Sequence, residues 1–391
     1  MADIDKLIDD LEPREHVEVL IAGAGVAGLE AAFALRELAG DRVGVTLVAP
    51  TDEFVYRPMA VAEPLTSGWA HHNPLAQLAA EAGAELRHDV VREVDAENRV
   101  VRTDGGSELR YDALVVCLGT SMHARYEHAI TVDDARMEEL LHGLVQDVEE
   151  GHVRRLAVVI PAPMPWPLPA YELALMCSER ARDMQTQLTV TVLTPEESPL
   201  SGFDSEASLA LSRLLTERRI DVVTSAHCEV PTAKTVMGHQ GGRSLAFDRV
   251  VALPELRGPG LRGLPHDRKG FIPIDGYGQV RGVDRVWAAG DATDYPVKHG
   301  GVSAQLADTV SRSVAALTGA CSAPPTFEPV LEGVLLTGGT PRYVRGRATG
   351  GHGAESELIE VSRRAAPMKI AARYLTPHLV APGSSQTGAP A

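Results

Sequence analysis

The stretch VEVLIAGAGVAGLE at residues 17–30 constrains this chain more than any other feature of its sequence. The apolar run 17–22 predicts a buried strand, and three glycines lead into an alanine-rich helix over 29–38. Gly23 allows a tight turn, Gly25 lets a pyrophosphate approach the backbone, and Gly28 lets the helix pack close to the strand. The helix N-terminus then offers free N–H groups to phosphates. The stretch predicts a dinucleotide site; the alternative is a glycine turn between two core elements.

A second turn of this kind occurs late in the chain. Residues 285–291 read RVWAAGD, another apolar strand that ends in Gly290 and Asp291, and a helix opens near Ser303. The two turns together resemble the two-part FAD signature of the pyridine-nucleotide and sulfide-oxidising flavoproteins. A third element, YDALVVCLGT at 111–120, is similar to the strand that closes the first FAD half of that family, and it contains Gly119. The resemblance implies that the cofactor is FAD.

The resemblance also implies roles for residues around the flavin. Asp291 would bind the ribityl chain, and Gly301 would lie at the flavin pyrimidine, where the following helix points its N-terminus. Lys298 could add positive charge at that edge and raise the flavin potential, and its alternative is a solvated loop lysine. His299 could relay a proton or line a quinone-like pocket, and its alternative is an ordinary loop histidine. These two residues are the catalytic candidates.

Three further positions follow from the same resemblance. Arg57 and Pro58 would lie at the flavin ring, and the backbone of Val91 would pass the adenine. One position departs from the family pattern. The strand at 43–50 ends near Ala49, where an acidic residue normally binds the ribose hydroxyls. Asp52 or Glu53 would have to reach round to replace that acid.

The order of the expected elements predicts an α/β fold with two Rossmann-like, doubly wound, three-layer domains of the FAD/NAD(P)-binding type. We expect the FAD-binding domain to be split over 1–125 and 246–320. Residues 126–245 alternate strands and helices and predict the second domain. Residues 321–391 predict a small C-terminal segment with a hairpin, a helix at 367–381 and a low-complexity tail.

The second domain lacks the usual nicotinamide loop. Residues 161–172 read PAPMPWPLPAYE, with five prolines and no glycine. Proline offers no N–H to a phosphate and fixes φ, so the loop cannot form the glycine turn. The next strand ends at Thr194 rather than at an acid. Conventional NAD(P)H binding is therefore not expected. The loop is either a rigid spacer or a wall over the flavin, with Trp166 as a lid.

Three hypotheses differ in what reduces the flavin. The first is a small donor whose two electrons pass to a quinone-like acceptor. The second is an NAD(P)H dehydrogenase with an unconventional nucleotide site. The third is a non-catalytic flavin-binding partner protein. The loop resembles that of sulfide:quinone oxidoreductases, but Trp166 stands where their redox cysteine would be. Sulfur oxidation would then need one of three other cysteines near the ring: Cys117, Cys177 or Cys321.

Composition limits the remaining function classes. The net charge of −16 argues against nucleic acid as a partner. No run of about 18 apolar residues predicts a membrane span, and the acidic N-terminus does not read as a secretory signal. We expect a cytoplasmic protein with no metal site. The amphipathic segment 367–381 could touch the inner face of a membrane, pack on the protein itself, or pack on a second subunit in a homodimer.

Overall fold

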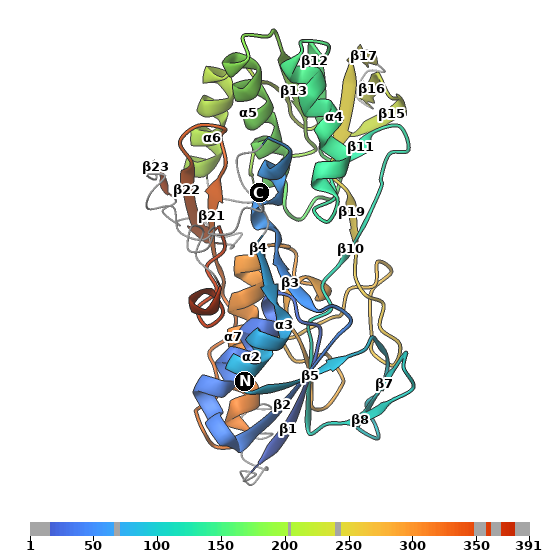
Figure 1. Ribbon diagram of the computed structural model, residues 1–391, viewed down its shortest axis with the longest axis vertical. Helices are drawn as coiled ribbons and strands as arrows, with labels where there is room; N and C mark the ends of the chain where they lie inside the picture. The colour runs from blue at the N-terminus through green and yellow to red at the C-terminus, as the bar shows by residue number, and fades with distance from the viewer. Residues whose placement is uncertain are drawn as a thin grey trace, which may run out of the picture.

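The computed structural model describes residues 16–65, 71–201, 205–238, 244–347, 357–360 and 369–379. Two α/β units lie end to end along the long axis of the molecule (Figure 1). The chain passes from the first unit to the second and back, and the antiparallel pair β10 and β19 forms one of the connections. These two strands span Ser121–His123 and Glu255–Arg257.

The first unit is built on a five-stranded parallel sheet with the order β20-β9-β1-β2-β5. Its central strand β1 is almost entirely buried, as its apolar sequence predicts for a strand covered on both faces. Helices α2 and α7 pack against each other beside this sheet. The strands are β1 Val17–Ala22, β2 Val43–Ala49, β5 Ala84–His88, β9 Ala113–Val116 and β20 Val286–Ala288, and the helices are α2 Val26–Ala39, α3 Leu75–Glu81 and α7 Gly300–Ala316.

The second unit repeats this plan. Its parallel sheet has the order β11-β18-β12-β13-β14, and its central strand β12 leads into the proline-rich loop and then into α5. Each unit also carries a three-stranded antiparallel sheet, β6-β7-β8 in the first and β15-β16-β17 in the second. The prediction of two Rossmann-like domains is confirmed. The sheet strands are β11 Ile130–Thr131, β12 Arg155–Val159, β13 Thr189–Leu193, β14 Asp221–Val223 and β18 Arg249–Ala252, and the helices are α4 Met137–Glu149, α5 Leu168–Asp183 and α6 Ser205–Glu217.

The remaining strands lie outside the two parallel sheets. The antiparallel sheets consist of β6 Val91–Asp95, β7 Val100–Thr103, β8 Glu108–Arg110, β15 Cys228–Thr232, β16 Thr235–Gly238, β17 Ser244–Ala246, β3 Glu53–Tyr56, β4 His71–Pro74, β21 Val330–Leu335, β22 Arg342–Arg347 and β23 Glu357–Glu360. The described residues also form four 3-10 helices: η1 Gly40–Arg42, η2 Arg57–Leu65, η3 Gly290–Ala292 and η4 Thr376–His378. Strands β21 and β22 pair as an antiparallel hairpin in the segment where we expected one.

The C-terminal segment differs from its expected form. Residues 369–379 contain the single turn η4 instead of a continuous helix. Pro377 lies within that turn and cannot continue an α-helix. The backbone N–H groups of Ile370, Tyr374 and Leu375 are bonded to side chains of other elements, which holds the segment in an irregular path. The predicted low-complexity tail lies outside the described residues. No helix in the described part of the chain is long and apolar enough to cross a bilayer.

Candidate functional site

The first glycine turn brings three backbone segments into close contact. Gly23 has φ +104°, and its N–H donates to the carbonyl of Val48 at 2.8 Å. A Cβ on Gly23 would overlap the carbonyl of Cys117, and a Cβ on Gly28 would overlap the carbonyl of Gly23. Helix α2 therefore begins in direct contact with the turn. A side chain at either glycine would push the helix away from the sheet.

Gly25 is in a different position from its two neighbours. It is the N-cap of α2 with an ordinary φ of −78°, and an added Cβ would meet no protein atom within 4 Å. No side chain caps this helix end among the described residues. The first turn of α2 thus presents N–H groups and a positive dipole end to open space. This uncapped helix end, beside a glycine backbone with no side chain, fits the pyrophosphate of a dinucleotide.

The second glycine turn packs against the first. Gly290 has φ +77°, and a Cβ there would lie 2.9 Å from that of Ala27. The carboxylate of Asp291 follows in η3 and accepts a hydrogen bond of 3.0 Å from the hydroxyl of Ser303 on α7. Burial raises the pKa of Asp291, while the Lys298 ammonium and this hydrogen bond partly counter the increase. A carboxylate with one protein donor retains acceptor capacity for the hydroxyls of a ligand.

Lys298 is buried and bonded to the loop that follows Asp291. Its Nζ donates to the carbonyl oxygens of Thr293 and Tyr295, the latter at 2.8 Å, and lies 4.2 Å from the ring centroid of Phe271. Burial lowers its pKa to about 8, against the attraction of nearby carboxylates. The ammonium therefore fixes the loop carrying Asp291, and the solvated-loop alternative for this lysine is wrong because only 7% of the residue is exposed.

His299 lies under the proline-rich loop. Its ring stacks at a tilt of 33° on Trp166, with 4.4 Å between ring centroids, and its Nδ1 is buried with no hydrogen-bond partner among the described residues. Burial, followed by the charge of Lys369, lowers the pKa of His299 to about 4. The imidazole is thus a neutral ring with an unused nitrogen, at the residue that caps α7. The structure brings Trp166 to a catalytic candidate that is distant in sequence.

A buried ion pair beside this histidine was not predicted from the sequence. Glu172 on α5 is fully buried, and its Oε2 lies 2.7 Å from Nζ of Lys369. Its Oε1 accepts the backbone N–H of Leu336 at 3.0 Å. Burial raises the pKa of Glu172, and Lys369 partly counters that effect. The only sequence signal was an acid inside the apolar helical run 170–176, which does not reveal a partner 197 residues later.

The residues expected at the flavin ring and adenine lie on separate elements. Arg57 begins η2, and its guanidinium pairs with Asp134 at 3.3 Å, while Pro58 follows it in the same turn. Val91 is buried at the start of β6, where the register with β7 shifts between Val91 and Glu93. Gly119 has φ +67° and open space at its Cβ position.

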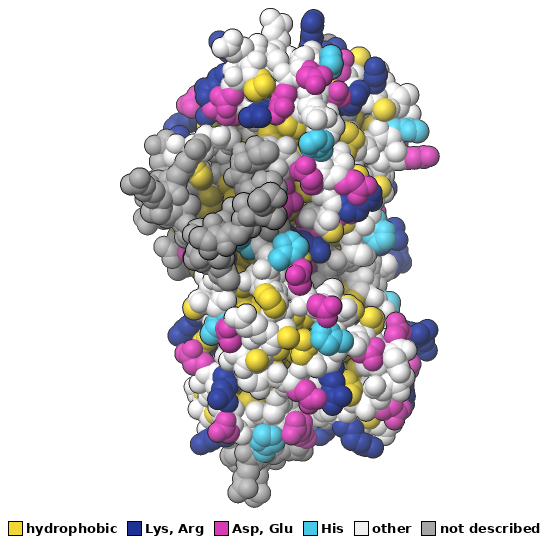
Figure 2. Space-filling view, in the orientation of Figure 1, with side chains coloured by type: hydrophobic (Ala, Val, Ile, Leu, Met, Phe, Trp, Pro, Cys, Tyr) yellow, Lys and Arg dark blue, Asp and Glu magenta, His cyan; other side chains and the backbone are white. Residues whose placement is uncertain are grey.

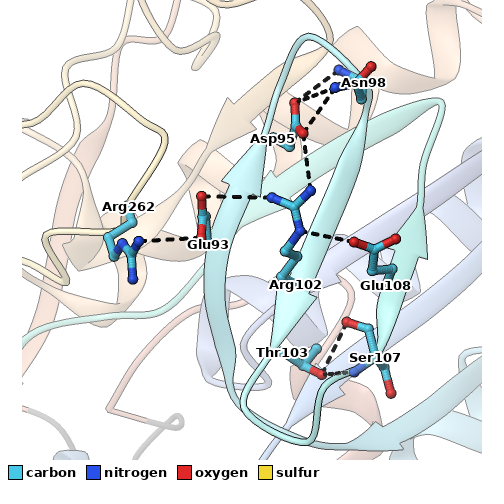
Figure 3. Close-up of polar contacts among 8 residues, drawn as sticks. All are labelled: Glu93, Asp95, Asn98, Arg102, Thr103, Ser107, Glu108 and Arg262. Atoms are coloured by element: carbon cyan, nitrogen blue, oxygen red, sulfur yellow. Dashed lines mark hydrogen bonds and ion pairs between the residues drawn. The ribbon is translucent and has the colours of Figure 1, made fainter.

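The small sheet that contains Val91 is tied together on its solvent side (Figure 3). Arg102 on β7 reaches Glu108 at 3.0 Å, Asp95 at 3.3 Å and Glu93 at 3.7 Å. Exposed ion pairs contribute little stability one by one, but this arginine connects all three strands. The cluster therefore holds the irregular backbone at the predicted adenine position.

Asp52 and Glu53, the acids expected to reach round toward Ala49, each pair with a histidine. Ala49 ends β2, and its carbonyl accepts the N–H of Asp89 at 3.2 Å. The Asp52 carboxylate pairs with His88 at 3.3 Å, and that of Glu53 pairs with His72 at 2.8 Å. Both acids thus have exposed histidine partners. The departure from the family pattern at this strand end persists in the structure.

The cysteines are poorly placed for thiol chemistry. Burial raises the pKa of Cys117 and of Cys177 to about 12, so neither forms a thiolate readily. Cys321 follows the C-terminal end of α7, while His299 precedes its N-terminal end. A helix of 17 residues separates them by roughly 25 Å at 1.5 Å per residue. The described residues contain no cluster of three or more His, Cys, Asp or Glu side chains that could hold a metal ion.

Comparison with known proteins places the chain in a family. The sequence profile of the pyridine nucleotide-disulphide oxidoreductases matches residues 17–159 and 169–314, more than half of the chain. This protein belongs to the pyridine nucleotide-disulphide oxidoreductase family. Family membership confirms the prediction of an FAD-dependent oxidoreductase and does not specify the electron donor. The gap in the match, 160–168, covers most of the proline-rich loop, so the family profile and the missing glycines agree on where the chain diverges.

Individual relatives are more distant. A sulfide-quinone reductase of Aquifex aeolicus is 26% identical over 223 residues, 53% of this chain and 50% of that protein. The mitochondrial sulfide:quinone oxidoreductase of Mus musculus is 26% identical over 113 residues, 28% of this chain and 24% of that protein. The alignments thus span half or less of these curated relatives.

Solved structures share the fold over most of the chain. The sulfide:quinone oxidoreductase of Aquifex aeolicus superposes with a TM-score of 0.77 at 17% identity, covering 87% of this chain and 86% of that one. NDH2 of Plasmodium falciparum, solved in complex with NADH, superposes with a TM-score of 0.67 at 12% identity, covering 90% and 92%. At such identities the likeness shows the fold alone.

Proposed function

We propose that this protein passes two electrons from a small donor through FAD to a quinone-like acceptor. The observation that carries the proposal is the stacked pair of Trp166 and His299 at the N-terminus of α7. A flat aromatic surface next to a neutral imidazole with an unused buried Nδ1 suits a neutral, planar ligand with a carbonyl oxygen. The family membership supports the flavin half of the proposal.

Residues of the two glycine turns would hold FAD. Bound FAD supplies the two-electron redox chemistry. The backbone around Gly25 and the uncapped N-terminus of α2 would bind the pyrophosphate, and Asp291 would accept the ribityl hydroxyls. Gly301 begins α7, whose positive end would favour negative charge at the flavin pyrimidine. Lys298 would act on that site through the loop it fixes.

Reduction of a quinone consumes protons as well as electrons. His299 is neutral at physiological pH, so its one ring N–H can donate a hydrogen bond to a carbonyl oxygen, but the ring does not carry the extra proton of an imidazolium. Lys369 lies close enough to affect the charge of His299 and is bonded to Glu172. We propose that Lys369 gives a proton to the acceptor nitrogen of His299 as the ring N–H proton passes to the quinone oxygen, and that Lys369 regains its proton from water afterwards.

A second candidate function keeps NAD(P)H as the donor. A cavity of about 360 Å³ opens beside Ala162, which follows β12 in the second sheet, and residues from two other segments complete it: Arg125, Tyr126, His227 and Cys228. The carboxyl edge of a parallel sheet is where such folds bind nucleotides. Arg125 could replace the missing backbone donors for a phosphate. The five prolines of the neighbouring loop weigh against this candidate.

Flavin absorbance distinguishes these functions. Under anaerobic conditions, dithionite-reduced holoprotein should be reoxidised within seconds by a short-chain ubiquinone analogue. Trp166→Ala should slow that step at least tenfold, while the matched variant Trp166→Phe, which keeps a stacking ring, should retain most of it. Failure of any quinone analogue to reoxidise the flavin would refute the acceptor assignment.

The same assay run in the forward direction identifies the donor. Rapid bleaching of the oxidised flavin by NADH, lost in Arg125→Ala, would establish the second candidate function. Bleaching by sulfide alone would mean that a cysteine reaches the flavin despite its burial. If dithionite is the one reagent that bleaches the flavin and no quinone restores it, the protein is a non-catalytic flavin-binding partner protein.

Two other predictions concern partners. Leu375 and Leu379, on the apolar side of the segment expected to touch a membrane, are buried in the main core of this chain. We therefore do not propose a membrane contact through them. Acidic and basic side chains are interspersed on the face that Figure 2 shows. That nucleic acid is not a partner stays a prediction. The homodimer stays a prediction.

A further inference from the structure

The segment 369–379 crosses the molecule as a strap between the two units. At its start, Lys369 is bonded to Glu172 of the second unit. The next residue, Ile370, donates its N–H to the hydroxyl of Tyr56 at 2.8 Å and packs against Gly300, the first residue of α7. At its end, the described turn η4 lies beside the first unit (Figure 1). The strap therefore covers the N-terminus of α7, beside Lys298 and His299.

Glu30 of α2 anchors the middle of the strap. This residue is fully buried, and its two carboxylate oxygens accept the N–H groups of Tyr374 at 2.9 Å and Leu375 at 2.6 Å. Burial raises the pKa of Glu30, and these N–H bonds work in the opposite direction by stabilising its anion. The strap thus depends on a side chain that must accept with both oxygens at once.

A second carboxyl lies against this anchor. Asp308 of α7 hydrogen-bonds Glu30, and its Oδ1 is buried with no partner among the residues that the structure describes. Arg312 of α7 and Arg373 of the strap are the cations close enough to act on Asp308. Two carboxyl groups in contact and partly shielded from water cannot both be ionised without a large cost. Because the N–H donors favour the anion of Glu30, a proton shared by the pair would reside on Asp308.

We propose that Glu30 and Asp308 share one proton, and that this proton fixes residues 369–379 as a strap that closes the site at the N-terminus of α7. Both are positioning residues, because they act on that site through Ile370 and Lys369. The effect on turnover rests on the proposed function, whereas the fastening of the strap does not.

The direction of the pH effect follows from the contacts. Burial, together with the neighbouring Glu30, raises the pKa of Asp308 to about 8, well above its ordinary value. Undocking would open Asp308 to water and return its pKa toward the ordinary value, so docking takes up a proton and weakens as pH rises toward 8. Between pH 7 and 9 the docking constant should fall about tenfold, since one proton is lost from the docked state over that interval.

Hydrogen exchange of the full-length holoprotein tests the strap without any electron transfer. After correction for the intrinsic exchange rate, protection of the amides at 370–378 should fall about tenfold from pH 7 to 9 in the wild type. Asp308→Asn keeps an N–H donor toward Glu30 but cannot titrate, so its protection should not change over this range. Glu30→Gln should lose protection at both pH values, while Glu217→Gln, the same change at the exposed end of α6 in the second unit, should behave as wild type.

Constant protection in the wild type, or titration of Asp308→Asn like the wild type, would overturn the proposal. If Glu30→Gln fails to fold, the wild type and Asp308→Asn still decide the question. A pH-dependent strap in a protein whose flavin no quinone oxidises would support this inference and refute the proposed function. Where quinone turnover is present, Asp308→Asn should remove the alkaline rise in KM for the quinone and leave kcat within twofold.

Discussion

Valine at position 25 should leave a folded protein that has lost most of its flavin. Gly25 has an ordinary φ, and an added Cβ meets no protein atom within 4 Å, so the protein itself has room for the side chain. The space it would enter is that proposed for the pyrophosphate. Gly28, three residues later, offers the opposite case, because a Cβ there overlaps the carbonyl of Gly23. Comparing valine at these two positions therefore separates loss of cofactor binding from loss of folding.

Gly25→Val should mainly lower the affinity for FAD, whereas Gly28→Val should lower the stability of the fold. Gly25→Val exchanges one N-cap residue for a poorer one, which costs about 1 kcal/mol of stability. Forcing extra carbon atoms into a packed site costs about 1–3 kcal/mol, and here that cost falls on the bound state, so FAD affinity should drop roughly 10- to 100-fold. In Gly28→Val the same cost falls on the fold and should reach about 3 kcal/mol or more, a large part of the stability of a typical domain.

The assay is the ratio of flavin to protein absorbance after purification, followed by urea denaturation of flavin-free protein. Gly25→Val should carry much less flavin than the wild type, with an unfolding midpoint close to that of flavin-free wild type. Gly28→Val should be poorly folded whether or not FAD is added. A fully yellow Gly25→Val, or one that unfolds as readily as Gly28→Val, would refute the assignment of open space at Gly25 to the cofactor.

Three further outcomes are expected. Because burial lowers the pKa of His299 to about 4, the unfolded chain takes up a proton between pH 6.5 and 4 that the folded chain does not. The contribution of His299 to the free energy of unfolding should therefore be complete above pH 6.5 and fall by roughly 3 kcal/mol toward pH 4. His299→Gln should flatten that decline in urea titrations. Glu172→Gln should cost about 3–5 kcal/mol in thermal unfolding, since it leaves a buried ammonium unpaired, and a loss under 1 kcal/mol would contradict the buried pair. Replacing Cys117, Cys177 or Cys321 singly by serine should leave the rate of flavin reduction within a few-fold of wild type in stopped-flow absorbance. Loss of reduction in any one variant would revive thiol chemistry.

Local patterns in the sequence predict the parts of this protein that depend on backbone chemistry. The apolar run before Gly23 and the glycine spacing after it specify a strand, a turn and a helix, because each requirement is met by residues a few positions apart. The proline-rich loop is equally readable, since proline removes N–H donors wherever the chain goes. The αβ alternation then predicts both Rossmann-like units.

The side-chain partners were decided by the tertiary structure. Glu30 reads as one helical residue among alanines, yet it anchors a strap 344 residues later. His299 reads as a loop histidine until Trp166 covers it, and the expected helix around Leu375 is replaced by a path that other elements hold through its N–H groups. Burial and charge depend on which segments meet in space, and no local pattern carries that information. The sequence alone therefore determined the fold and the cofactor turn, and packing determined which groups lost water and found partners.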